Sequence, residues 1–403
     1  MWDVLKDGTP FASSKTLLII VGRVCVWDNA PPPSGEGKGE REKTKHTHPL
    51  RRGRGRGRLP FLPEENRMQY TPTMPRARIA ILYVGGSIGM VVNRRTGRIE
   101  PMESLSLIHR AIPEMQREVS LQFTSLDNIG SSEVTPAHWT AIAEKIRELY
   151  AAFDGFVVIH GTNTLSYTAA ALSFALQNLS KPVVLTGALL PLNELAGDGR
   201  MNLIFAIRAA QLDVAEVCVV LGPRVLRGTR AKKVEDSLLQ TFDSPRFPPL
   251  ADFSTGVRLH PWRIVRRKRA LLARSTFDPN VIVVTLTPGI ADAYLQSVLA
   301  SKPHGIVLRA YGPGMLPERL FPWLRELKRA HIPVVFVSQT LRGSIDLHRF
   351  RKQLTLEELG EISGKNMSFE CATAKLMWAL TQVKTPLRLR ELMERSLVGE
   401  LDE

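Results

Sequence analysis

Residues 156–202 read FVVIHGTNTLSYTAAALSFALQNLSKPVVLTGALLPLNELAGDGRMN, and this stretch predicts the architecture of the chain. The apolar run 156–159 is too short for a helix and is typical of a buried strand. A helical pattern follows over 167–178, and the run 183–186 predicts the next strand. Strand, helix and strand in this order make a βαβ unit, which implies a parallel sheet that binds ligands beyond the carboxyl ends of its strands.

The turn after the first of these strands is small and rich in hydroxyl groups. Residues 161–164, Gly-Thr-Asn-Thr, place two hydroxyls and an amide where the predicted helix starts. With the N–H groups of a helix start, such side chains can hold a polar ligand or an oxyanion. Taken alone, Thr162 and Thr164 are more often simple helix caps, so the short motif leaves both interpretations open.

Composition bounds the class of protein. A chain of 403 residues with 44% hydrophobic residues can bury a large core and predicts two domains. No apolar stretch approaches the length of a membrane-spanning helix. The cysteines, Cys25, Cys218 and Cys371, are widely spaced, odd in number and without metal-ligand spacing. They favour a reducing compartment and no disulfide framework.

The formal net charge of +15 raises the question of nucleic-acid binding. The excess of basic over acidic residues is spread along the chain, and solvent-exposed side chains account for most of it. Residues 1–73 are unlike the rest of the chain. Pro-rich and Gly-rich segments there predict a disordered basic tail, and the alternative is a gene model that extends too far upstream. Its Arg-Gly run at 51–58 could contact RNA phosphates, the weakest of the functional hypotheses.

A second glycine-rich turn follows the predicted strand at residues 78–84. The sequence there is Gly85-Gly86-Ser87-Ile88-Gly89. Glycines around a hydroxyl at a strand end let backbone N–H groups approach a ligand closely. As a bare pattern this motif is only weakly specific for a binding site.

Together these segments resemble the asparaginase family. Its second signature, H-G-T-D-T, is similar to residues 160–164, and its Y-T-A/S-A-L-S-F helix, K-P-V strand and T-G-x-x-x-P-L turn are similar to 167–174, 181–183 and 186–192. Its first signature, G-G-T-I-G-M, is similar to residues 85–90. The likeness is greatest for the cytoplasmic type I branch and extends over about residues 76–400.

The resemblance implies a catalytic set. Ser87 stands where the family has its nucleophilic threonine, and Thr162 would orient substrate or water. Lys233, at the end of a segment similar to R-G-N-R-T-T-K, would move protons. Asn163 takes the place of the family aspartate, and Gly86 and Gly161 would bind substrate through their backbones.

A polar segment before the helix predicted from Thr135-Pro136 completes the expected site. Residues 130–133 resemble the family loop D-S-S-D or G-S-Q-D, which holds the α-carboxylate and ammonium of the substrate. Ser131, Ser132 and Glu133 are therefore the expected substrate-binding residues, although an ordinary polar lead-in to a helix is an equally good account of the bare sequence.

The resemblance implies two α/β domains, a larger one with a mostly parallel sheet at 74–261 and a smaller one at 279–403, joined by a linker at 262–278. It implies hydrolysis of L-asparagine to L-aspartate and ammonia in a cytoplasmic homodimer or homotetramer, without metal or organic cofactor. Three departures oppose it: Asn163 is uncharged, Phe350 lacks a phenol, and Ser87 is less restrained than threonine. The alternative is a degenerate member that binds an amino acid or a partner without turnover.

Overall fold

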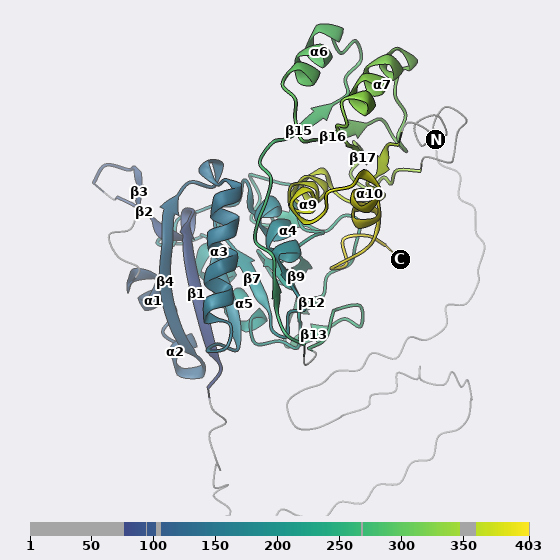
Figure 1. Cartoon of the computed structure of the whole chain (residues 1–403). Helices are drawn as coiled ribbons and strands as arrows, with labels where there is room; N and C mark the ends of the chain where they lie inside the picture. Colours follow the sequence, from purple (N-terminus) through teal and green to yellow (C-terminus); the bar gives the residue numbers. More distant parts are fainter. Residues whose placement is uncertain (1–75, 94, 102–105, 267–268, 347–359, 403) are drawn as a thin grey trace, which may run out of the picture. The chain divides into compact units, whose positions relative to one another are not determined.

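The computed structural model describes residues 76–93, 95–101, 106–266, 269–346 and 360–402 (Figure 1). The tail at 1–73 and Phe350 therefore lie outside the described residues. Residues 75–403 form one compact unit. Within the part of it that is described, no helix is long and apolar enough to cross a membrane.

The larger sheet is mixed. Within the described residues it has eight strands in the order β13-β12-β9-β8-β7-β5-β1-β4. The strands from β8 to β4 in this order pair in parallel, and the hairpin strands β9, β12 and β13 add antiparallel pairing. Their bounds are β1 (Arg78–Gly85), β4 (Ser120–Ile129), β5 (Gly155–Ile159), β7 (Val183–Thr186), β8 (Val217–Val220), β9 (Arg224–Arg227), β12 (Ala251–Phe253) and β13 (Val257–Leu259).

Both faces of this sheet are covered, which explains why its central strands are almost entirely apolar. Along β1, Ile79 and Ile81 pack in one core with helix α5 (Gly199–Ala209). Ala80 and Leu82 face the opposite side and pack in a second core with α3 (Pro136–Leu149) and α4 (Leu165–Ala175). The sheet thus lies between two helical layers, and the carboxyl ends of its parallel strands are left to loops.

The smaller sheet is parallel throughout. Its strands are β15 (Val281–Thr285), β16 (Gly305–Ala310), β17 (Val334–Ser338) and β18 (Ile362–Ser363). Helix α9 (Phe369–Gln382) packs both on this sheet and on α4, with the Phe174 and Trp378 rings stacked at 5.9 Å (Figure 1). The other helices among the described residues of this part are α6 (Asp292–Ala300), η4 (Glu318–Leu320), α7 (Phe321–Arg329) and α10 (Pro386–Glu394).

Shorter elements complete the described residues. They are η2 (Ser87–Gly89), β2 (Met90–Val92), β3 (Ile99–Pro101), α1 (Ser106–Ala111), α2 (Met115–Glu118), η3 (Ser131–Glu133), β6 (Leu176–Gln177), β10 (Lys232–Lys233), β11 (Phe242–Asp243) and β14 (Leu272–Ala273).

The predicted two-domain α/β fold with a mostly parallel larger sheet is confirmed, and one helix boundary is wrong. The helix predicted over 167–178 is α4, which ends at Ala175. Leu176 and Gln177 instead pair with β14, and Asn178 has a positive φ of 59°. Pairing with a segment about 95 residues away overrides the local helical pattern there. The domain boundaries at 261 and 279 stay a prediction.

Candidate active site

Ser87 lies at the first of the two predicted turns. β1 ends at Gly85, and Gly86, with φ 91°, leads into η2, which begins at Ser87. A Cβ on Gly86 would lie only 2.6 Å from the Cα of Gly161, so the two turns are in backbone contact. This contact requires glycine, because no side chain fits between the loops. It places the half-buried Ser87 beside the turn that carries Thr162.

Lys233 joins the same cluster from a different element. It lies in β10, which pairs with β11, and its backbone N–H donates to the Ser166 hydroxyl. Its ammonium donates to Thr162 Oγ1 at 3.0 Å and to Asn163 Oδ1 at 2.8 Å. Thr162 is buried, whereas Asn163 is exposed. The structure therefore brings a buried hydroxyl and a lysine into direct contact beside the Ser87 turn.

The predicted substrate loop contacts this turn through Ser131. The buried Ser131 hydroxyl accepts from the Asn163 N–H at 3.2 Å, and its carbonyl accepts from the Thr164 hydroxyl at 2.7 Å. Ser132 and Glu133 are exposed, as a ligand-binding role requires. Thr164 is the N-cap residue of α4 but makes no side-chain cap hydrogen bond. Its hydroxyl instead donates to the Ser131 carbonyl of the predicted substrate loop, so the capping interpretation of Thr164 is wrong.

His160, the last residue before the turn, is a supporting residue that was not among the predicted site residues. It is fully buried, and its Nδ1 lies 2.7 Å from the Gly161 carbonyl oxygen. A carbonyl can only accept, so Nδ1 carries the proton. On the other side of the ring, Nε2 lies 3.1 Å from the Thr168 hydroxyl, which accepts from the Trp139 indole N–H at 3.0 Å. The Thr168 hydroxyl therefore donates to Nε2.

This chain of hydrogen bonds determines both the tautomer and the charge of His160. Burial lowers the pKa of His160 to about 4, so the ring is neutral near pH 7. By holding the Gly161 carbonyl, the ring orients the whole Gly161–Thr162 peptide plane and hence the Thr162 N–H. The sequence feature that could have identified His160 as a supporting residue is its position directly after a fully apolar strand, at the start of a polar turn.

The neutral His160 predicts a specific pH dependence of stability. The pKa of His160 in the folded state, about 4, lies below its ordinary value of about 6.5. The stability that the neutral ring gives the folded state is therefore complete above pH 6.5 and is lost as the pH falls toward 4. The difference amounts to about 3 kcal/mol. Between pH 7 and 4, urea unfolding of wild type should lose more free energy than that of His160→Asn, which keeps a donor but cannot titrate. If the free energy of unfolding fell equally with pH in the two proteins, the assignment of a neutral, buried His160 would be wrong.

The turn after β7 is held by a separate buried pair. The Asp198 carboxylate accepts from the N–H groups of Leu189 and Leu190 and from the Asn202 amide. Asn202 in turn accepts from the Gly222 N–H at 2.7 Å, which joins this turn to the end of β8. Three neighbouring strand ends are thereby supported by buried side chains, which gives the site a rigid base.

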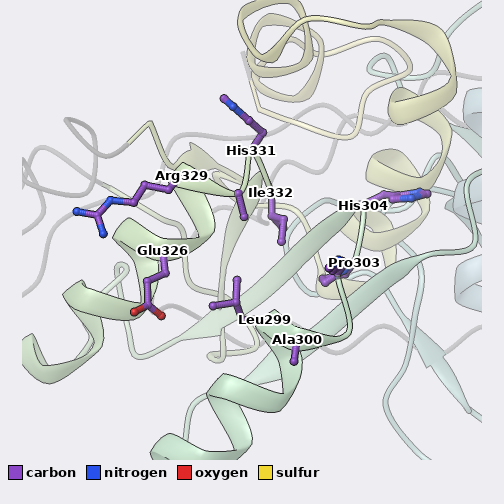
Figure 2. Close-up of a pocket in the computed structure, with 10 residues that line it drawn as sticks. Leu299, Ala300, Pro303, His304, Glu326, Arg329, His331 and Ile332 are labelled. Atoms are coloured by element: carbon purple, nitrogen blue, oxygen red, sulfur yellow. The ribbon is translucent and has the colours of Figure 1, made fainter.

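A wide hollow of about 880 Å³ lies elsewhere, in the C-terminal half of the chain. Figure 2 shows it between the last turns of α6 and α7, with Leu299, Glu326 and Arg329 among its lining residues. None of the predicted site residues lines it. The hollow therefore does not coincide with the predicted site, whose residues lie in loops at strand ends of the larger sheet.

A larger and a smaller α/β sheet, with a hydroxyl turn and a threonine–lysine pair at strand ends of the larger one, fit the class of α/β amidohydrolases. Family comparisons agree: the profile "Asparaginase, N-terminal" matches residues 78–264 and "Glutaminase/Asparaginase C-terminal domain" matches residues 280–393. The chain belongs to the asparaginase family.

Individual relatives support the same family. L-asparaginase 1 of Escherichia coli (strain K12) is 34% identical over 336 residues, which cover 81% of this chain and 99% of that protein. Among solved structures, the thermostable L-asparaginase from Thermococcus kodakarensis has a TM-score of 0.74 at 32% identity, covering 81% of this chain and 99% of its own. L-asparaginase I from Vibrio cholerae has a TM-score of 0.73 at 32% identity, covering 81% and 100%.

Proposed function

We propose that this protein hydrolyses L-asparagine to L-aspartate and ammonia, with Ser87 as the nucleophile. The observation that carries the proposal is the 3.0 Å contact between Lys233 Nζ and Thr162 Oγ1 beside the Ser87 turn. The relatives named L-asparaginase, matched over almost their whole length, support the same reaction.

The reaction follows from the hydroxyl groups of the site. The Ser87 oxygen attacks the side-chain amide carbon of asparagine and forms an ester, while the amide nitrogen takes up a proton and leaves as ammonia. Water then attacks the ester, releasing aspartate and restoring the Ser87 hydroxyl. Lys233 moves protons through its contact with Thr162, and Thr162 orients the substrate or the water.

Backbone groups supply the remaining stabilisation. In both steps the carbonyl oxygen gains negative charge, and N–H groups near Gly86 and Thr162 can bind it without reorganising. The backbone contact between Gly86 and Gly161 supports this role because it keeps side chains out of the space around both turns. The hydrogen bond from His160 to the Gly161 carbonyl restrains the peptide that donates from Thr162.

The charged ends of the amino acid are assigned to the loop at η3. Exposed Ser132 and Glu133 face solvent beside the turn, and Ser131 joins the loop to the Asn163 backbone. Glu133 would bind the substrate ammonium, and the serine hydroxyls and loop N–H groups would bind its carboxylate.

Ammonia release from purified protein tests the proposal directly. Asparagine should yield equimolar aspartate and ammonia, and glutamine in parallel would report the preference for side-chain length. Absence of ammonia, together with asparagine binding in calorimetry, would favour the alternative, a family member that binds without turnover. Asn163 is the described residue that gives that alternative its chemical basis, since it offers Lys233 a neutral oxygen.

Asn163→Asp is expected to raise kcat/KM by at least about tenfold, equivalent to about 1.4 kcal/mol. The Asn163 oxygen already lies 2.8 Å from Lys233 Nζ, so a carboxylate there would pair with the lysine and with a substrate ammonium nearby. Steady-state kinetics of both proteins measure the gain. Asn178→Asp adds the same charge at an exposed position directly after β6 and should leave kcat/KM unchanged. High wild-type activity that falls in Asn163→Asp would contradict the role.

Assembly and location are proposed together with the activity. We expect a homodimer or homotetramer, and the strongly exposed Leu238, in the loop that follows Lys233, supports an interface near the site. Cys218 and Cys371 are both free and buried, which supports a reducing, cytoplasmic location. Sedimentation velocity of the purified protein measures its oligomeric state.

A further inference from the structure

A small cavity lies beside β10, between the segment that carries Lys233 and the smaller domain. Its volume is about 10 Å³, which is space for one atom or one water-sized occupant. Thr229, Arg230, Lys232 and Arg246 line it from the larger domain, and Asn366 and Ser368 line it from the smaller one. Lys232, which lines the cavity, directly precedes Lys233 of the proposed active site.

Two of the lining residues carry buried polar atoms without a partner. The Thr229 hydroxyl and the Arg230 Nη1 group make no hydrogen bond among the described residues. Their residues are only 2% and 4% exposed, so bulk water does not satisfy them. Buried donors in native proteins are almost always paired, and leaving one unpaired is destabilising. Two such groups on one cavity indicate an occupant that accepts hydrogen bonds.

The charge around the cavity favours an anion as that occupant. Three of the lining side chains are cationic and none is acidic. Arg230 pairs with the exposed Asp402, and Lys232 pairs with Glu370, so these two charges are compensated on other sides. Arg246 forms no ion pair among the described residues, although Glu370 and Asp402 favour its charge; its guanidinium donates to the backbone carbonyls of residues 340, 341, 366 and 367.

Repulsion from Arg230 also disfavours the charge of Arg246. Burial, and next the neighbouring Arg230, lower the pKa of Arg246. Burial is likewise the main cause that lowers the pKa of Arg230. A neutral water in the cavity would satisfy hydrogen bonds but leave this repulsion in place, whereas an anion relieves both costs.

We propose that this cavity binds one monatomic anion of chloride size, held by Thr229 Oγ1 and Arg230 Nη1. The anion joins the loop before Lys233 to the Asn366–Ser368 segment of the smaller domain. It thereby stabilises the contact between the two domains next to the proposed active site, and it has no part in the chemistry.

Bromide replacement tests the site in the wild-type protein. Crystals grown or soaked in sodium bromide should show an anomalous peak within hydrogen-bond distance of Thr229 Oγ1 and Arg230 Nη1. Density without an anomalous signal, which would mean a water molecule, overturns the proposal. A bromide peak that appears only on the outer surface would be an adventitious ion only, and it would also overturn the proposal.

A thermal unfolding series tests the same site in solution. Wild type should melt about 2 °C or more higher in sodium chloride than in sodium gluconate of equal ionic strength, because an anion that binds only the folded state stabilises it. Thr229→Val should abolish this difference. Thr140→Val, which removes a hydroxyl that bonds to Ser275 on the outer side of α3, should retain it. Equal chloride effects in wild type and Thr229→Val overturn the proposal.

Discussion

Ser87→Ala is expected to lower kcat for asparagine by about 10⁴-fold or more, because the variant has no oxygen with which to attack the amide. The side chain follows Gly86, whose backbone is packed against Gly161, and the other hydroxyl of the cluster, on Thr162, already contacts Lys233. We assign the Thr162 hydroxyl to orienting substrate or water, so we expect it not to replace Ser87 as the nucleophile. Stopped assays of ammonia release measure the loss, and the melting temperature should stay close to that of wild type.

Two further variants sharpen this result. Ser87→Thr restores the family's nucleophile and limits its rotamers, so it should retain or raise the activity. Ser120→Ala removes an exposed hydroxyl at the start of β4, which pairs with Arg78 at the opposite end of β1 from the Ser87 turn, and should leave kcat unchanged. Equal activity in wild type and Ser87→Ala would remove Ser87 from the mechanism and direct the search to Thr162.

Lys233→Met is expected to lower kcat by about 10²- to 10⁴-fold, the range for loss of a positioned proton-transfer group. Its ammonium is the one described cation within hydrogen-bond distance of Thr162, at 3.0 Å. Methionine keeps the length and the apolar stem of the side chain, so the β10 backbone and its hydrogen bond to Ser166 should persist. Single-turnover kinetics separate the chemical step from substrate binding.

The adjacent lysine provides a matched control. Lys232 points away from Thr162 and pairs with Glu370, and its ammonium lies 4.6 Å from the Phe369 ring centre. Lys232→Met should therefore lower the melting temperature, because it leaves the buried Glu370 unpaired, with little change in kcat. If both lysine variants lost activity equally, the effect would belong to the packing of β10 and not to proton transfer.

Local patterns predicted the strands of this fold well. The apolar runs at 78–84 and 281–286 are β1 and β15 to within one residue. β1 is buried on both faces, which gives a strong signal, whereas β15 is a half-buried edge strand that is recognised by its β-branched residues. Thr135 and Pro136 are the N-cap and first residue of α3, as predicted from cap chemistry alone. β4 was not predicted, because its burial alternates and its polar residues, from Ser120 to Asn128, resemble a loop.

Local patterns identify some of the predicted site residues and not others. Ser87 and Thr162 follow directly from strand ends, so a sheet topology is enough to place their turns near one edge. Lys233 lies 71 residues beyond Thr162 in a basic run, and nothing local distinguishes it from Lys232. Only the resemblance to asparaginases selected it, and the roles of all these residues stay predictions until the kinetic experiments are done.

By itself, the sequence determined the alternation of strands and helices, the hydroxyl-bearing turns and the absence of a charge at Asn163, since these depend on residue identity and on short-range backbone preference. Tertiary structure alone decided which lysine meets Thr162, where α4 ends and which nitrogen of His160 carries the proton. Each of these depends on contacts between segments far apart along the chain: β10 with the Thr162 turn, β14 with β6, and Trp139 with Thr168. Local preferences are worth a few tenths of a kcal/mol per residue, and such long-range pairing overrides them.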